Sequence, residues 1–148
     1  MYKKVLLPTD GSPISRKAVK QGVAFAKSIG AKVVGFFSAD DYRTGTYAVY
    51  VASAYPLSRT EFETQAKEAA RKQLAVVERA AAQAGVPYEG VYKMSSEPWQ
   101  AIIETAKQKK CDLIFMGSHG RRGLVGVVLG SQTTKVLTHS KIPVLVAR

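Results

Sequence analysis

A glycine-rich stretch, residues 116–135, has the residue types expected to bind a phosphorylated ligand. It follows an apolar run, 113–116, which predicts a buried strand, and it leads through Gly130-Ser131 into a helical pattern. Glycines at such a junction let the backbone approach a bulky anion, and the N–H groups of the helix N-terminus then point at that anion. The stretch therefore predicts a phosphate cradle, and hence a nucleotide as the ligand.

A second polar segment, residues 8–12, follows an apolar run at the start of the chain. In an open α/β sheet, ligands bind beyond the carboxyl ends of the strands, at the point where the strand order reverses. If the strands at 3–8 and 112–117 are central neighbours, this segment meets residues 117–120 there, and the strand end at 38–40 joins them. Three pieces far apart in the sequence would then form one site.

Apolar runs and helical patterns alternate along the chain. Ser12, and the segment Ser95-Ser96-Glu97-Pro98, are expected to cap the helices that follow them. The alternation implies right-handed crossovers and an open parallel α/β sheet with helices on both faces, in a single domain over residues 1–148. Strands are predicted at 3–8, 32–38, 88–94, 112–117 and 142–147, and helices at about 13–29, 58–84, 98–109 and 130–140.

The segment 39–57 has no clear period. It mixes acidic residues, Gly45, Pro56 and four tyrosines. This is long for a loop in a compact domain, so the segment is either a functional flap or contains short structure that the pattern does not place.

The composition excludes several classes of function. No apolar run approaches the roughly 20 residues that cross a bilayer, and the N-terminus lacks the layout of a signal peptide, so we expect a cytoplasmic protein. The single cysteine, Cys111, and the two histidines, His119 and His139, form no Cys/His cluster that would bind a metal. The net charge of +11 suits phosphorylated molecules, but most cations fall singly at helical spacing, so specific nucleic-acid binding is not expected.

The spacing of the glycines matches a known signature. Gly117-x2-Gly120-x9-Gly130-Ser131 resembles the ATP-binding signature G-x2-G-x9-G-[ST] of the universal stress protein family. Residues 5–12 are similar to the first strand and acidic turn of that family, and residues 142–146 to its last strand. The resemblance covers the whole chain. It implies a flavodoxin-like, Rossmann-like sheet with strand order 3-2-1-4-5, and ATP as the ligand. Separately from the resemblance, Mg²⁺ or Mn²⁺ could bridge the phosphates with Ser131 as a ligand, although the sequence shows no protein cage for a metal.

The resemblance also implies how the nucleoside half of ATP is held. Asp10 is expected to accept hydrogen bonds from the ribose hydroxyls, as an acid at this turn does in other nucleotide-binding folds. Pro8, Thr9 and Ser38 are expected to line the adenine or ribose side, with Met116 packed nearby. Ser38 departs from the valine that members of the family often have at this position.

The phosphate half is expected to lie along the signature itself. Gly117, His119 and Gly120 are expected to approach the ribose and the phosphates. Backbone N–H groups and hydroxyls at the start of the last helix, helped by the helix dipole, are expected to meet the β- and γ-phosphates. These groups belong to Gly130, Ser131, Gln132 and Thr133.

Three functions stay open. The first is a nucleotide-binding regulatory protein, which is favoured because the chain lacks the G-x4-G-K-[ST] lysine and an evident catalytic base near the γ-phosphate. The second is a slow ATPase or autokinase with Ser118, Ser131 or Thr133 as the phosphate acceptor. The third is an interaction module that dimerises through the last strand, 142–147, because that strand would be an exposed edge. The family resemblance implies such dimers.

Overall fold

The computed structural model describes residues 1–42, 58–119 and 129–148. Strands and helices alternate along these residues, as the sequence pattern indicates. In chain order they are β1 (Lys4–Pro8), α1 (Pro13–Ser28), β2 (Lys32–Ala39), α3 (Arg59–Ala84), β3 (Tyr88–Met94), α4 (Pro98–Gln108), β4 (Leu113–Gly117), α5 (Ser131–His139) and β5 (Val144–Ala147).

The strands form one five-stranded sheet in the order β3-β2-β1-β4-β5, and every pairing is parallel. The expected order 3-2-1-4-5 is therefore confirmed. β1 pairs with β2 from Lys4 opposite Lys32 to Pro8 opposite Phe36, and its other edge pairs with β4. The strand order thus reverses between β1 and β4, so the connections that leave these two strands start side by side.

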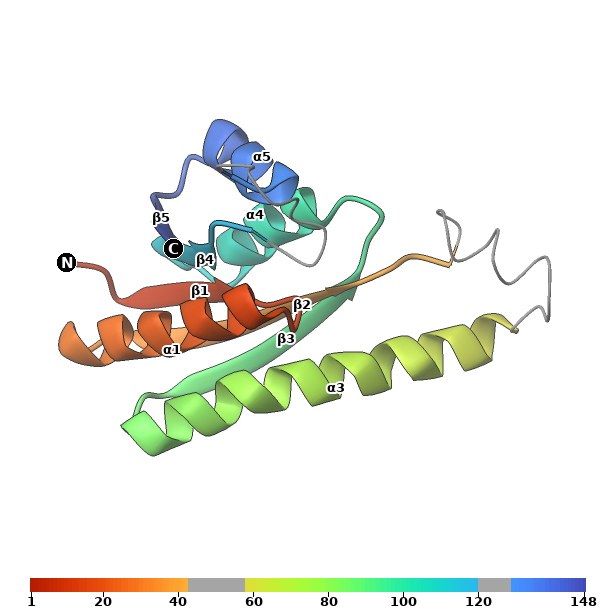
Figure 1. The fold of residues 1–148 in the computed structure, drawn as a ribbon, viewed down its shortest axis with the longest axis horizontal. Helices are drawn as coiled ribbons and strands as arrows, with labels where there is room; N and C mark the ends of the chain where they lie inside the picture. The colour runs from red at the N-terminus through yellow and green to blue at the C-terminus, as the bar shows by residue number, and fades with distance from the viewer. Residues whose placement is uncertain (43–57, 120–128) are drawn as a thin grey trace.

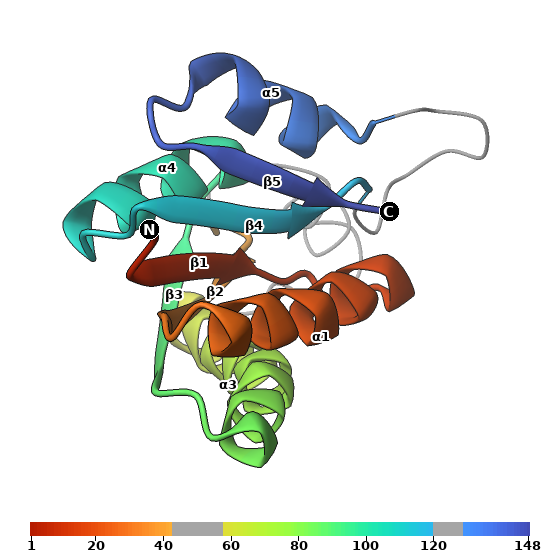
Figure 2. The same ribbon diagram turned by 90° about the vertical axis from the view of Figure 1, so that its left-hand side faces the viewer.

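Helices cover both faces of the sheet (Figures 1 and 2). α1 and α3 pack on one face around a core that includes Val5 and Leu7, whereas α4 and α5 pack on the other face, around a core that includes Leu6. Successive side chains of a strand point to opposite faces, so β1 contributes to both cores in turn. This double burial explains why the central strands read as continuous apolar runs.

Two of the four described helices begin at a side-chain cap. The Ser12 side chain accepts a hydrogen bond from the Ser15 N–H at the start of α1, and Ser58 with Glu61 forms a capping box at the start of α3. The expectation for α4 was wrong in one respect. Its N-cap is Glu97, whose side chain makes no capping hydrogen bond, and Ser95 instead accepts from the Glu97 N–H at 3.0 Å.

The buried cysteine behaves as a packing residue. Cys111 belongs to the core beneath α4 and α5, and burial raises the pKa of its thiol to about 11. The thiol therefore stays protonated at neutral pH, the form that is least reactive. No helix in the described ranges is long and apolar enough to cross a membrane. The segment 43–57, which makes up most of the region 39–57 without a clear period, lies outside the described residues.

Candidate functional site

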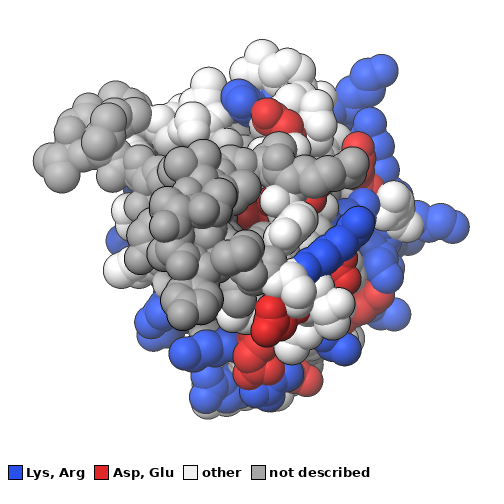
Figure 3. Space-filling model, turned by 90° about the vertical axis from the view of Figure 1, so that its right-hand side faces the viewer, with Lys and Arg blue, Asp and Glu red and all other residues white. Residues whose placement is uncertain are grey.

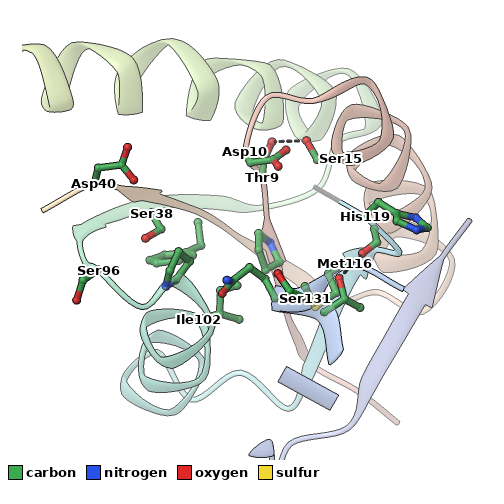
Figure 4. Close-up of a pocket in the computed structure, with 17 residues that line it drawn as sticks. Thr9, Asp10, Ser15, Ser38, Asp40, Ser96, Ile102, Met116, His119 and Ser131 are labelled. Carbon is green, nitrogen blue, oxygen red and sulfur yellow. Dashed lines mark hydrogen bonds between the residues drawn. The ribbon is translucent and has the colours of Figure 1, made fainter. Parts of the chain in front are cut away.

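A cavity of about 380 Å³ opens at the carboxyl ends of the central strands (Figure 4). Small-molecule sites in proteins typically measure about 300–1,000 Å³. In Figure 4, Asp10 and Thr9 lie on one side, Ser131 and Ile102 lie across from them, and Ser38 lies toward one end. The lining residues are Pro8, Thr9, Asp10, Ser15, Phe36, Ser38, Asp40, Ser96, Pro98, Ile102, Met116, Gly117, His119, Gly130, Ser131, Gln132 and Thr133.

The turn after β1 is held rigidly by its own side chains. Asp10 accepts a hydrogen bond from the Ser12 N–H at 2.9 Å, which forms an Asx turn. The Thr9 hydroxyl is buried and lies 3.2 Å from the Ser15 hydroxyl. Gly11 adopts a left-handed φ of 78°, a conformation that glycine reaches without strain. These contacts hold the Asp10 carboxylate at the cavity wall, where carboxylate oxygens are hydrogen-bond acceptors.

The N-terminus of α5 supplies backbone donors to the same cavity. The first N–H groups of a helix have no intrahelical acceptor, so those of Ser131, Gln132 and Thr133 are positioned to bind an anion. The Gly130 N–H was expected to serve in the same way, but it donates to the Ser118 carbonyl at 2.7 Å. This hydrogen bond ties the start of α5 to the end of β4 and removes the Gly130 N–H from the set of donors.

The side chains of two α5 residues, Gln132 and Thr133, form hydrogen bonds within the protein. The Thr133 hydroxyl is 2% exposed and donates to the Gly117 carbonyl at 3.0 Å, so it holds α5 against β4. The Gln132 side-chain oxygen accepts a hydrogen bond from the backbone N–H of Trp99 at 3.0 Å. Trp99 lies in the first turn of α4, so Gln132 caps a neighbouring helix. Only the backbone N–H groups of these two residues fit the expected role.

The opposite wall is largely apolar. Phe36 comes from β2, Met116 from β4, and Pro98 with Ile102 from α4. A flat hydrophobic ligand such as a nucleobase would fit between such side chains, because ligand sites combine apolar walls with a few placed polar groups. The sequence pattern at Pro98 and Ile102 indicates only the start of a helix and does not predict their place in the cavity wall. The signal that could have found them is topological, since the connection after β3 must also reach the carboxyl edge of the sheet.

The described lining of the cavity is acidic. Asp10 and Asp40 contribute carboxylates, and none of the described lining residues is Lys or Arg. Figure 3 shows the face that carries the carboxyl ends of the strands, where basic side chains are spread around the rim and acidic ones lie among them. Gly120, which was expected at the site, and the neighbouring Arg121 and Arg122 lie outside the described residues.

Gly117 lines the cavity and also serves the packing of a neighbouring helix. A Cβ at this position would lie 3.2 Å from the Ile14 side chain and 3.5 Å from that of Ala18, both on α1. The glycine therefore allows α1 to pack closely against the end of β4.

The two residues after Gly117 contact each other through their side chains. The Ser118 hydroxyl lies 3.0 Å from Nδ1 of His119. Apart from Gly120, each residue expected at the site lines this cavity.

A family model matches the chain over residues 1–148, and its description is the universal stress protein family. Universal stress protein YxiE from Bacillus subtilis is 34% identical over 152 residues, which cover 100% of both chains.

Two solved structures resemble this one along nearly its whole length. The structure of hypothetical protein MJ0577 from Methanocaldococcus jannaschii has a TM-score of 0.81 at 27% identity and covers 99% of this chain and 96% of its own. A universal stress protein solved in complex with cAMP has a TM-score of 0.66 at 25% identity, with coverages of 99% and 97%.

Proposed function

The chain belongs to the universal stress protein family, and we propose that it is a regulatory member that binds ATP in the cavity described above. The observation that carries this proposal is the convergence of the turn after β1 with the N-terminus of α5. Asp10 and Ser131, far apart in the sequence, line one cavity. The similar protein that was solved with cAMP supports an adenine nucleotide as the class of ligand.

Each part of ATP has a matching part of the wall. The adenine ring lies among Phe36, Ile102 and Met116, where burial of its faces is favourable. The ribose hydroxyls donate to the Asp10 carboxylate, which is the usual partner of a ribose in doubly wound folds. The phosphates lie at the N-terminus of α5, where N–H groups and the helix dipole favour negative charge.

A divalent cation would enter with the nucleotide. No group of three or more His, Cys, Asp or Glu side chains in the described ranges could hold a metal ion by itself. Mg²⁺ or Mn²⁺ would therefore be held mainly by phosphate oxygens, with the Ser131 hydroxyl as a protein ligand. The carboxylates of Asp10 and Asp40 repel free ATP, so the metal complex, which has less negative charge, is the favoured form.

Binding is better supported than phosphoryl transfer. The Thr133 hydroxyl is committed to the Gly117 carbonyl, and the Ser118 hydroxyl is only 4% exposed, so two of the three proposed phosphate acceptors are hidden from a bound nucleotide. Ser131 is exposed and remains the candidate acceptor for slow autophosphorylation. The proposed setting is the cytoplasm and the proposed role a response to stress, with the bound nucleotide as the signal.

Calorimetric titration of ATP with Mg²⁺ into nucleotide-free protein tests the proposal. At about 100 μM protein, saturable one-site binding is expected, because this concentration detects even micromolar affinities. Titration at two temperatures guards against an enthalpy near zero, since burial of the base changes the heat capacity. Absence of heat at both temperatures would contradict the proposal. Mass spectrometry of any small molecule that co-purifies with the protein identifies the natural nucleotide.

We also propose a homodimer that forms through β5. This strand is an edge of the sheet, paired on one side with β4, and its four residues are each partly exposed. An edge strand leaves one row of N–H and C=O groups without sheet partners, and a second copy that pairs antiparallel would satisfy them symmetrically.

A further inference from the structure

Two buried side-chain oxygens in the described part of the chain lack a hydrogen-bond partner, namely Ser38 Oγ and Thr105 Oγ1. Folded proteins satisfy most buried polar groups, because a hydroxyl that loses water without gaining a partner is destabilising. An exception of this kind calls for a reason, and one common reason is a partner that arrives with a ligand.

The two hydroxyls differ in where they lie. Ser38 lines the cavity near the end of β2, on the same face of the sheet as Phe36, and Figure 4 shows it beside the cavity with Ser96 and Asp40 nearby. Thr105 lies in α4, is 0% exposed and does not line the cavity. A ligand in the cavity can therefore provide a partner for Ser38 and not for Thr105.

The surroundings of Ser38 restrict which part of a nucleotide it meets. Its neighbours in the cavity wall include the apolar side chains of Phe36, Pro98 and Ile102, which suit the base, whereas the phosphate donors lie at the start of α5. A nucleobase has apolar faces and a polar edge of ring nitrogens and exocyclic groups. A serine hydroxyl can both donate and accept, so it fits either kind of atom on that edge.

We propose that the Ser38 hydroxyl hydrogen-bonds the base of the bound nucleotide and makes base recognition in this chain depend on a side chain. Ser38 lines the cavity, and a serine has a single side-chain torsion to its oxygen, so a change of χ1 is all that is needed to reorient the hydroxyl. This inference rests on the proposed nucleotide binding.

If the proposal holds, removing the Ser38 hydroxyl lowers the affinity for the nucleotide without lowering the stability of the empty protein. Replacing a hydroxyl that has its partner only in the complex should leave the empty protein as stable as before, or more stable, while weakening the complex. A hydroxyl that serves the fold would do the reverse. Stability and affinity must therefore be measured on the same variants.

The test uses Ser38→Ala, with Thr105→Val as the matched control for an unpartnered hydroxyl outside the cavity. Affinities for ATP and for ribose 5-triphosphate, which has no base, are measured with Mg²⁺ present, and the nucleotide-free proteins are unfolded in urea. For Ser38→Ala we expect ATP affinity to fall about two- to tenfold. We expect the affinity for ribose 5-triphosphate and the urea midpoint not to fall. Thr105→Val should keep both affinities.

Three outcomes would overturn the inference. One is Ser38→Ala protein that binds ATP as tightly as the wild type. Another is an equal loss of affinity for both ligands, since the hydroxyl would then act away from the base. A third is nucleotide-free Ser38→Ala protein with a lowered urea midpoint, which would assign the hydroxyl to the fold. Ser38→Cys, which keeps the volume but is a weak hydrogen-bonding group, should lose ATP affinity as Ser38→Ala does. Wild-type protein that binds neither ligand contradicts the proposed function itself.

Discussion

The side-chain oxygen of Gln132 accepts a hydrogen bond from the backbone N–H of Trp99 at 3.0 Å. Gln132 belongs to the first turn of α5 and Trp99 to the first turn of α4, so one bond joins the N-termini of two helices. α4 contributes apolar residues to the cavity, and α5 contributes backbone donors. The contact therefore sets the apolar wall of the cavity and its lining at the start of α5 relative to each other.

Replacing Gln132 with Leu should lower the free energy of unfolding by about 1 kcal/mol, because the Trp99 N–H loses its acceptor while the side-chain volume is nearly kept. Urea unfolding, followed by the fluorescence of the single tryptophan, measures this change. Gln100→Leu, at an exposed position of α4, is the control and should leave stability within about 0.5 kcal/mol of the wild type. Equal stability of the two variants would argue against the capping role of Gln132.

Asp10→Asn should weaken ATP binding about tenfold or more, since hydrogen bonds from the ribose hydroxyls to a charged acceptor contribute strongly. Asparagine keeps an oxygen that can accept from the Ser12 N–H, so the turn should persist. The affinity for 2′,3′-dideoxy-ATP should not fall, because that analogue lacks the two hydroxyls.

Asp40→Asn is the matched control for this prediction, as it removes the other carboxylate of the described cavity lining. Its effect should be the same for ATP and for the dideoxy analogue. If Asp10→Asn also affected both nucleotides equally, Asp10 would act through its charge or its turn, and the assignment to the ribose would be wrong.

The side chain of Tyr88 makes the free energy of unfolding depend on pH in the alkaline range. Burial, with a smaller contribution from Glu78, raises the pKa of the Tyr88 phenol from 10.0 to about 12. Between these values the phenol ionises in the unfolded chain but stays neutral in the folded protein. The stabilisation is thus complete below pH 10 and is lost as the pH rises toward 12.

Tyr88→Phe should remove this part of the pH dependence, which urea unfolding at a series of pH values between 9 and 12 would detect. The variant also loses the hydrogen bond from the Tyr88 hydroxyl to the Leu74 carbonyl, so it should be less stable at neutral pH. Tyr92→Phe, on the same strand at a 40% exposed position, should retain the alkaline slope. A slope that persists in Tyr88→Phe would show that other groups cause it.

Val146→Pro should convert the proposed dimer to a monomer. Ala147 and Pro143 direct their carbonyls to β4, so alternation along the strand directs the backbone of Val146 to the open edge. Proline there removes an outward N–H and leaves the pairing with β4 intact, as is usual for proline in edge strands. Light scattering should give twice the chain mass of 16.0 kDa for the wild type and for Val146→Ala, and 16.0 kDa for Val146→Pro. A monomeric wild type would contradict the dimer.

The parts of the fold that follow from local pattern could be predicted from the sequence. Alternating apolar runs and caps such as Ser12 place each strand and helix within a few residues, because burial and capping act over short distances. The turn at Asp10 and the junction at Ser131 line one cavity because the strand order reverses between β1 and β4, and the sequence indicated this order only through the family resemblance.

What the sequence could not supply are the contacts between elements. The capping of α4 by Gln132 joins residues from two helices, and neither local pattern indicates it. A side chain at Gly117 would contact α1, and this follows from how closely that helix packs against β4. Ile102 joins the cavity through tertiary packing of α4 on the sheet. These are properties of packing, which the periodicity of one segment does not record.

A titration of ¹⁵N-labelled protein with ATP and Mg²⁺, followed through the backbone amide resonances, tests the central claim most directly. We expect saturable shifts that are largest for the amides of residues 9–12 and of Ser131, Gln132 and Thr133, because the ribose and the phosphates contact these two segments. The start of the edge strand β3, where Tyr88 pairs with Val33 at the opposite end of the strands from the cavity, should shift least. Absence of saturable shifts, or saturable shifts that spare both segments, would contradict the claim that these segments form one nucleotide site.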